Sequence, residues 1–436
     1  MPRSLMNRLR TNRFLTAEPS VFAVEVAFMS LLTVANPLLK QKLYRVYSGQ
    51  FSAEGMTELE AAHFVQRKIV TWSQWQWLLP MPLTMVSGVV IGAYGDKYGR
   101  QFNVLMGMIA AVFDQLFSLL VFSHTIDGPV YLLVIGQTLS CSLGEFVTTH
   151  LGASSYLTDI YPEKQLLKRM TFLQILSSVG RILGSVAAGF LPEYTNPATL
   201  YTTIILVLAC AAIYSVFAMG QYPPPHNDTG LIHDYSAVKK DETNEMEVLE
   251  IEPKRSHEGD SVLATLRRSF KDTWRMMVQP RVGYVRFSLW AMLVADFFFY
   301  VILIQYLVLL GIYVVGPPLL WGEKEYGIFM AANNVIASMA LMSKALHLRD
   351  TTIMAVGFVG FAARMLPIAF GSQTWHIYLS SLVGTVGIVV QPALRTFIGS
   401  LLSPDEVGKF YALTALVSRL AIIFQTGVLQ AWSGWH

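Results

Sequence analysis

The chain has 436 residues, of which 14% are charged and 53% hydrophobic, and its mean hydropathy is +0.45. Soluble proteins carry charge on about a quarter of their residues, so this composition excludes an ordinary soluble domain and indicates an integral membrane protein. The net charge of +3 is small and the basic residues are spread over short segments, which argues against nucleic acid as a partner.

Apolar segments of about 20 residues, long enough to cross the hydrocarbon core of a bilayer as a helix, recur along the chain. Six are predicted in the first half, near 19–39, 74–95, 102–124, 130–153, 170–191 and 199–219. Five follow, near 286–312, 325–345, 351–371, 376–397 and 408–431. Pro80 and Pro82 predict a kink in the second span. The sequence therefore predicts an all-α membrane protein with about 11 transmembrane helices.

Lysine and arginine in the short connections indicate the orientation, because cytoplasmic loops carry an excess of both. Basic residues precede span one and lie between spans two and three, four and five, and eight and nine. The connections 124–130, 192–198 and 371–375 carry none. This pattern predicts a cytoplasmic N-terminus. The basic outer loop over 40–73 departs from the rule, but long loops are less diagnostic and this one also holds glutamates.

A polar stretch from about 220 to 283 separates the two sets of spans. Its acidic part, "KKDETNEMEVLEIEPKRSHEGD", is typical of a flexible linker. Its basic end, "LRRSFKDTWRMMVQPR", fits an amphipathic helix on the inner leaflet or a solvated basic face. We therefore expect an N-terminal six-helix bundle over 1–219, a cytoplasmic linker over 220–283 and a C-terminal bundle of about five helices over 284–436.

The connection between spans two and three reads "GAYGDKYGRQ". It resembles the motif that the major facilitator superfamily carries at this place, except that a glutamine ends it; the matching residues are Gly92, Asp96, Lys97, Gly99 and Arg100. Two helical halves joined by an inner linker also resemble that superfamily, whose carriers have twelve spans. A twelfth span is predicted to be lacking here, and the fusion of two spans into one is the alternative. The resemblance implies a conformational gate, in which Asp96 is expected to contact Arg100 and a helix N-terminus of the other half. A simple topology signal is the alternative.

Four segments resemble one branch of the superfamily, the proton-coupled folate transporter family (solute carrier family 46). They are "TAEPSVFAVEVAF", "GEFVTTHLGASSYLTDIYPEKQLLKRM", "PPLLWGEKEYGIFMAA" and "VVQPALRTFIGSLLSPDEVGKFYALTALVS". The resemblance places Asp159 and Arg395 on family positions that serve coupling, substrate binding or stability. Gln174 replaces the family's proton-coupling glutamate and Gln137 replaces an arginine. Neither folate as cargo nor proton coupling therefore follows from the resemblance alone.

Ionisable side chains within the spans mark candidate sites, because a charge at the bilayer centre costs roughly 2.5–3.5 kcal/mol on insertion scales. The acidic ones are Glu25, Asp114, Glu145 and Asp296, and the basic ones are Arg181, Arg364, Arg395 and Arg419. Equal numbers suggest mutual pairing, and we expect Glu145 to pair with Arg181, with a Glu145–Arg419 salt bridge as an alternative. Spans three and nine are peripheral in this architecture, so Asp114 and Arg364 are predicted to pack or pair.

A central chamber between the halves is the expected binding site. The residues predicted to bind substrate there are Arg181, Arg395, Arg419, Gln305, Tyr306 and Asn333. An arginine is always charged and its planar fork suits a carboxylate or phosphate, so the predicted cargo is a small organic anion. The last three residues would add neutral hydrogen bonds, although bonding between helices is the alternative.

Glu145, Asp159 and Asp296 are the predicted proton carriers, because a membrane-buried carboxylate can take up a proton on one face and release it on the other. No catalytic, cofactor-binding or metal-binding pattern is present, and both cysteines lie in apolar runs, so no enzyme is predicted. We expect a multi-pass symporter of the plasma membrane or of an endolysosomal membrane. A receptor or scaffold with a carrier-like shell that does not transport is the alternative.

Overall fold

The computed structural model describes residues 16–161, 163–219, 274–281, 284–342, 350–402 and 404–429. Within these ranges the secondary structure is helical, without strands. Seven helices are long and apolar enough to cross a membrane, and the other four predicted spans also coincide with helical residues. The predicted all-α membrane fold is confirmed.

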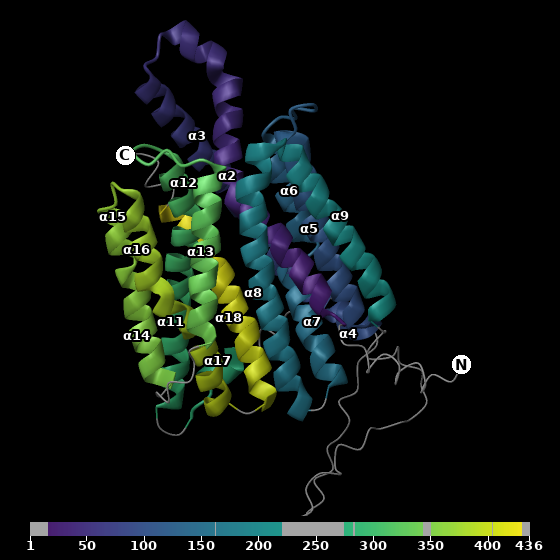
Figure 1. Ribbon diagram of the computed structural model, residues 1–436. Helices are drawn as coiled ribbons and strands as arrows, with labels where there is room; N and C mark the ends of the chain where they lie inside the picture. The colour runs from purple at the N-terminus through teal and green to yellow at the C-terminus, as the bar shows by residue number, and fades with distance from the viewer. Residues whose placement is uncertain are drawn as a thin grey trace, which may run out of the picture.

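The first half of the chain forms a group of helices coloured purple to teal in Figure 1. They are α2 (Glu18–Glu54), α3 (Glu58–Leu78), α4 (Met81–Tyr98), α5 (Arg100–Phe122), α6 (Tyr131–Ser142), α7 (Val147–Ile160), α8 (Glu163–Tyr194) and α9 (Pro197–Ala218). Helix α2 packs against α8, and α5 packs against α6, α7 and α9. Helices α2 and α8 also contact helices of the second half.

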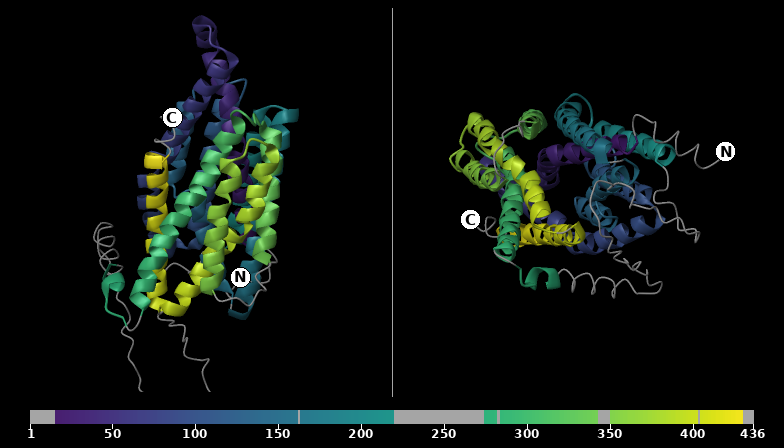
Figure 2. Two further views of the ribbon diagram at one scale, coloured as in Figure 1. Left: turned by 90° about the vertical axis from the view of Figure 1, so that its left-hand side faces the viewer. Right: turned by 90° about the horizontal axis from the view of Figure 1, so that it is seen from below.

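The second half forms the green to yellow group, which lies beside the first when the molecule is seen from below (Figure 2, right). Its elements are α11 (Val285–Ile304), η1 (Gln305–Leu309), α12 (Leu310–Val315), α13 (Glu323–Met342), α14 (Asp350–Ala363), α15 (Met365–Ala369), α16 (Thr374–Gly384), η2 (Thr385–Val389), α17 (Val390–Leu401), α18 (Pro404–Phe424) and η3 (Gln425–Leu429). Helix α11 packs against α18, and α14 packs against η2 and α17. Most of 220–283 lies outside the described residues, so the proposed linker boundaries remain a prediction.

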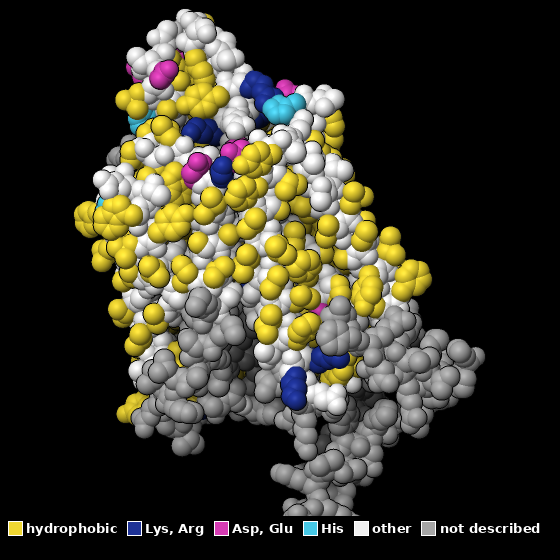
Figure 3. All heavy atoms as spheres, in the orientation of Figure 1, with side chains coloured by type: hydrophobic (Ala, Val, Ile, Leu, Met, Phe, Trp, Pro, Cys, Tyr) yellow, Lys and Arg dark blue, Asp and Glu magenta, His cyan; other side chains and the backbone are white. Residues whose placement is uncertain are grey.

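A broad belt of hydrophobic side chains covers the middle of the face shown in Figure 3, and charged side chains gather above and below it. Helices α9 and α11, for example, expose large hydrophobic side chains, including leucine, valine and phenylalanine. A belt of this kind is what a bilayer requires of the protein surface that it contacts. The surface therefore agrees with a molecule that spans the membrane from top to bottom in Figure 1.

Helix α2 is longer than its predicted span. At 37 residues it is about 55 Å long, which exceeds a hydrocarbon core of about 30 Å. Its end projects at the top of Figure 1, and α3 returns from there. The turn uses Gly55 in the left-handed conformation (φ 61°) and a capping box between Thr57 and Glu60. The predicted outer loop over 40–73 is thus largely a helical hairpin.

Two spans of the first half are broken. Span two divides into α3 and α4 at Leu79–Pro80, which confirms the predicted proline kink. Span four divides into α6 and α7, and there Gly144 (φ 88°) and Glu145 (φ 62°) have left-handed backbones. No proline in the sequence predicts the second break. A non-glycine residue with positive φ is strained, and such strain is concentrated at functional sites.

Candidate functional site

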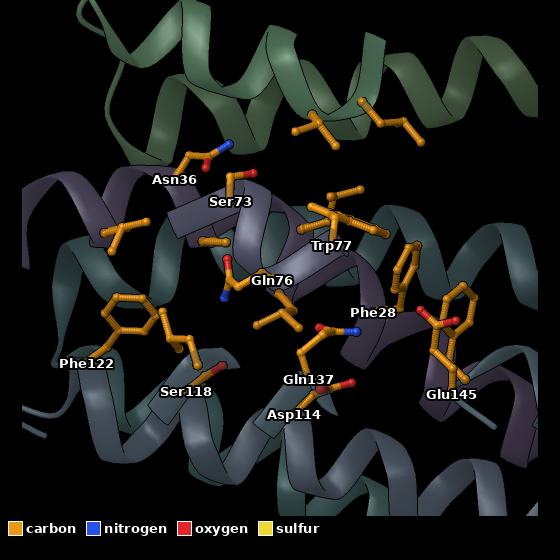
Figure 4. Close-up of a pocket in the computed structure, with 18 residues that line it drawn as sticks. Phe28, Asn36, Ser73, Gln76, Trp77, Asp114, Ser118, Phe122, Gln137 and Glu145 are labelled. Carbon is orange, nitrogen blue, oxygen red and sulfur yellow. The ribbon is translucent and has the colours of Figure 1, made fainter. Parts of the chain in front are cut away.

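A chamber lies between the two halves. Its larger part has a volume of about 560 Å³ and its smaller part about 90 Å³. The two parts adjoin, because they share seven lining residues: Phe28, Leu32, Trp77, Glu145, Phe146, Leu307 and Val308. We call the larger part the main chamber and the smaller part the annex (Figure 4). The main chamber falls within the range of roughly 300–1,000 Å³ that small-molecule sites occupy.

The second half supplies most of the polar side chains of the main chamber. They are Asp296 and Tyr300 of α11 with Thr414, Ser418 and Arg419 of α18. The first half contributes mainly apolar surface from α2, α3 and α7, together with Glu145. A few polar groups on an apolar wall are typical of a site that orients an organic ligand.

Glu145 and Arg419 form a salt bridge across the chamber. The Arg419 Nη1 donates to Glu145 Oε2 at 3.1 Å, and their side chains are 19% and 5% exposed. The bridge joins the break between α6 and α7 to α18, and so connects the two halves. This is the alternative pairing considered from the sequence, and it is confirmed. The expected pairing of Glu145 with Arg181 is wrong.

Arg181 pairs with Glu25 instead. Its Nη1 donates to Glu25 Oε1 at 2.8 Å, and Ser177 donates to the same oxygen at 2.6 Å. His150 Nε2 lies 3.2 Å from that oxygen, and Ser178 accepts from Arg181 at 3.0 Å. The cluster joins α2, α7 and α8 within the first half. The sequence analysis missed His150, which lies on a different helix. The two serines carry a signal in the sequence, because "SSVGR" places them one helical turn before Arg181.

Arg181 does not line the main chamber or the annex, but its helix face is directed toward the second half. Positions 181, 185 and 189 share one face of α8 at a spacing of four residues. Ser185 accepts a hydrogen bond from Asn334 of α13 at 3.4 Å, and Gly189 lies against Gly327 of the same helix. Arg181 therefore lies one helical turn before the contact of Ser185 with α13, and its side chain is 26% exposed.

Asp296 and Asp114 are the other carboxylates of the chamber wall. Asp296 lines the main chamber and is 1% exposed. Asp114 lines the annex, where its Oδ2 accepts a hydrogen bond from Ser140 at 2.7 Å. The hydrogen bond agrees with the packing or pairing role predicted for Asp114, although α5 also places this residue in the wall of the annex. No group of side chains able to hold a metal ion is found in the described part of the chain.

Tyr306, Asn333 and Arg364 occupy the second half but line neither part of the chamber. The Tyr306 hydroxyl donates to Asn333 Oδ1 at 3.4 Å and lies 3.4 Å from the Ser381 hydroxyl. The Arg364 guanidinium lies 3.5 Å from the centre of the Tyr306 ring, which is a cation–π contact, and the side chain is 3% exposed. The packing role predicted for Arg364 is confirmed. The side chains of Gln305 and Arg395 lie outside what the structure describes.

The glycine-rich motif lies at the lower end of the first half, where α4 meets α5 (Figure 1). Gly99 joins the two helices with φ 104°, a backbone that suits glycine. The Arg100 Nε donates to Asp159 Oδ2 of α7 at 3.1 Å. Asp159 is therefore a partner of the motif and is not among the chamber residues. The side chains of Asp96 and Lys97 and the surroundings of Gly92 lie outside what the structure describes, so the predicted contact of Asp96 with Arg100 remains a prediction.

The upper ends of the two halves are in contact. Lys40 donates to the Val315 carbonyl at 2.7 Å, and Gln41 donates to Glu323 at 2.5 Å. Lys324 of α13 forms a salt bridge with Glu193 of α8 at 3.2 Å. These contacts join the two halves at the same end of the molecule as the α2–α3 hairpin.

Comparison with curated proteins gives relatives of one family. The chain is 22% identical to the proton-coupled folate transporter of Rattus norvegicus, over 95% of this chain and 84% of the relative. It is 21% identical to the lysosomal proton-coupled steroid conjugate and bile acid symporter of Homo sapiens, over 97% and 90%. It is 22% identical to a probable peptidoglycan muropeptide transporter of Drosophila melanogaster, over 79% and 63%. These relatives are transporters of solute carrier family 46, which confirms the resemblance found in the sequence.

Solved structures with a similar fold are also transporters. The peptide transporter POT in complex with alafosfalin matches with a TM-score of 0.63 at 12% identity, over 96% of this chain and 88% of that one. The human organic anion transporter MFSD10 matches with a TM-score of 0.56 at 14% identity, over 96% and 92%. The family model of the Major Facilitator Superfamily matches residues 24–426. This chain, a multi-pass membrane transporter and not an enzyme, belongs to the major facilitator superfamily.

Proposed function

We propose that the protein is a secondary active transporter that moves a small organic anion together with protons by alternating access. The observation that carries the proposal is the Glu145–Arg419 salt bridge in the wall of the main chamber. It places one fixed cation and one titratable carboxylate together, at the junction of the halves. The names of the relatives support proton coupling, since those of rat and human are described as proton-coupled.

The salt bridge offers a simple means of coupling. A carboxylate of the cargo competes with Glu145 for the Arg419 guanidinium, whose planar N–H groups can donate to either carboxylate. Once displaced, the Glu145 carboxylate is buried without a cation, so binding a proton lowers its free energy. Anion and proton then enter together and the charge of the chamber is unchanged. Asp296 is proposed as a further proton carrier of the same wall.

We infer that the structure corresponds to a state open toward the lower end. Contacts between the halves close the upper end, where α8 packs on α13. With the N-terminus in the cytoplasm, as the basic connections indicate, this is an inward-facing state. Arg100 and Asp159 would then belong to a gate on the cytoplasmic side. Arg181, Tyr306 and Asn333 remain proposed ligand contacts that need a change of state or of rotamer. Arg395 and Gln305 also remain proposed ligand contacts.

Uptake by cells expressing the full chain tests the proposal. Labelled folate and taurocholate represent the two cargo classes named for the relatives, and each is offered in acidic and neutral outer medium. We expect saturable uptake of at least one anion that is faster in acidic medium, and its loss in Arg419→Gln at unchanged surface abundance. Arg419→Lys keeps the charge but loses the fork, so partial uptake is expected.

Saturable uptake that is equal in wild type and Arg419→Gln would contradict the role of Arg419. The absence of uptake of every anion tried, from a chain shown to reach the surface, would favour the alternative of a receptor or scaffold. Plasma and endolysosomal membranes are both proposed locations, so surface abundance is measured in the same cells. A variant that removes sorting to internal membranes would be used if the surface pool is small.

A further inference from the structure

The annex differs from the main chamber in its chemistry. Three primary amides and two hydroxyls line it, from Asn36, Gln76, Gln137, Ser73 and Ser118, together with the Asp114 carboxylate (Figure 4). Its volume of about 90 Å³ is well below that of a whole-ligand site. The annex therefore suits one polar head group of a larger solute.

Asp114 is the acidic side chain that the annex adds to the chamber. Among the described residues, the hydrogen-bond partner of Asp114 is a neutral hydroxyl, that of Ser140 on α6, at 2.7 Å. Glu25 and Glu145 are each bridged by an arginine, whereas no basic side chain forms a salt bridge with Asp114 among the residues that the structure describes. A carboxylate at this depth is costly unless it is paired, hydrated or protonated. The geometry leaves room for a cation to come from the ligand.

We propose that the annex binds a protonated primary amine of the cargo at Asp114, while a carboxylate of the same molecule binds Arg419 in the main chamber. This inference rests on the proposed function and narrows it, because the cargo becomes an organic anion that also carries an ammonium group, such as an acidic short peptide. The shared wall of Phe28, Trp77 and Phe146 lets one molecule extend from one part into the other.

The chemistry of the lining matches an ammonium group. A primary ammonium has three N–H donors and no acceptor. Asp114 accepts one of these hydrogen bonds, and the side-chain oxygens of Gln137 and Ser118, which also line the annex, are available for the others. The charges then balance in two pairs, ammonium with Asp114 and carboxylate with Arg419. An N-acylated amine has no charge and one N–H, so it loses both the pairing and two hydrogen bonds.

A matched pair of ligands tests the inference with the purified full chain in lipid nanodiscs. Binding of alanyl-glutamate and of N-acetyl-alanyl-glutamate is measured by calorimetry, first at neutral pH and then over a series of lower pH values. We expect the free amine to bind about tenfold more tightly or better, as a charge-assisted hydrogen bond predicts. Asp114→Asn should abolish this preference and leave the affinity for the acetylated peptide unchanged. Ser142→Ala is the control, since Ser142 lies on the same helix as Ser140 but is exposed and lines neither cavity.

Three outcomes would overturn the inference. Wild type could bind both peptides with equal affinity, the preference for the free amine could survive in Asp114→Asn, or neither peptide could bind. If instead Asp114→Asn flattens the pH dependence of both peptides alike, Asp114 is a proton site and the amine subsite is wrong. The proposed function is judged separately. It stands if the acetylated peptide or another anion binds in a manner that Arg419→Gln abolishes, even where the amine gives no advantage.

Discussion

Glu145 combines three features that seldom coincide in one residue. Its backbone is left-handed (φ 62°), its side chain is 5% exposed and it bridges to the opposite half through Arg419. The strain is local to the break between α6 and α7, so the residue is held where a regular helix would not place it. Glu145→Gln keeps this shape but cannot take up a proton.

We expect uptake by Glu145→Gln to lose its acceleration in acidic medium, with binding of the anion retained because Arg419 is freed from its internal partner. The initial uptake rate, measured with and without a proton gradient, checks this. Glu145→Asp is the conservative comparison and should keep part of the dependence on the gradient. Uptake by the glutamine variant that responds to the gradient as wild type does would show that another carboxylate carries the proton.

Asp127 fixes the projecting hairpin to the loop between α5 and α6. The hydrogen bond from the Lys42 ammonium, and then the charges of Lys42, Arg45 and His124, lower the pKa of this carboxyl below its usual 3.8. Lys42 itself is 4% exposed. A carboxyl with a lowered pKa contributes stability above its unfolded pKa and loses it as pH falls through the folded value.

The contribution of Asp127 should therefore be complete at neutral pH and disappear in strongly acidic medium, below about pH 4. Asp127→Asn is expected to lower the melting temperature at neutral pH, because it leaves the buried Lys42 ammonium without its carboxylate. The difference from wild type should shrink as the medium is acidified. Thermal unfolding in detergent over a series of pH values measures it, and a difference that is independent of pH would contradict the assignment.

At the scale of elements, the crossing of α8 and α13 depends on two glycines. A Cβ added to Gly327 would lie 2.5 Å from the Cα of Gly189, so one backbone would have to move. Gly88 in α4 is a matched control, because a Cβ there meets no atom within 4 Å. We expect Gly327→Ala to weaken closure of the upper end and Gly88→Ala to leave it intact.

The labelling rate of a cysteine at the annex measures that closure. In the Gln76→Cys background, Gly327→Ala should speed reaction with a membrane-impermeant maleimide added outside the cell, by several-fold. Gly88→Ala should give the rate of its parent. Equal rates for both glycine variants would show that the helix crossing does not limit access from above.

The sequence predicts elements better than it predicts their partners. Apolar runs of sufficient length predicted the spans, and Pro80 predicted one break. Both features depend only on residues of the same helix. The break at Gly144 and Glu145 carries no such signal. The choice of Arg419 over Arg181 for Glu145 depends on the rotation and height of α18 against α7, which are set by packing between helices 274 residues apart in the chain. Equal numbers of opposite charges therefore predicted pairing without predicting which charges pair.

At the scale of the whole molecule, alternating access requires the two halves to part at the upper end during each cycle. Glu193 and Lys324 lie across the contact between α8 and α13, with their charged atoms 3.2 Å apart. A covalent bridge at this place would hold the upper end closed. The salt bridge itself is more than a third exposed on both sides and is expected to contribute little to stability, so replacing it should be tolerated.

We expect the double variant Glu193→Cys with Lys324→Cys to transport while reduced and to stop when a short bifunctional thiol reagent with a cleavable disulfide spacer joins the two positions. A reductant should restore uptake, and each single variant should be insensitive to the reagent. Mass spectrometry of the linked peptides confirms the bridge before the rates are compared. Undiminished uptake by the bridged protein would show that α8 and α13 need not separate, and the two halves would then have to admit the cargo by a route other than the opening of this upper contact.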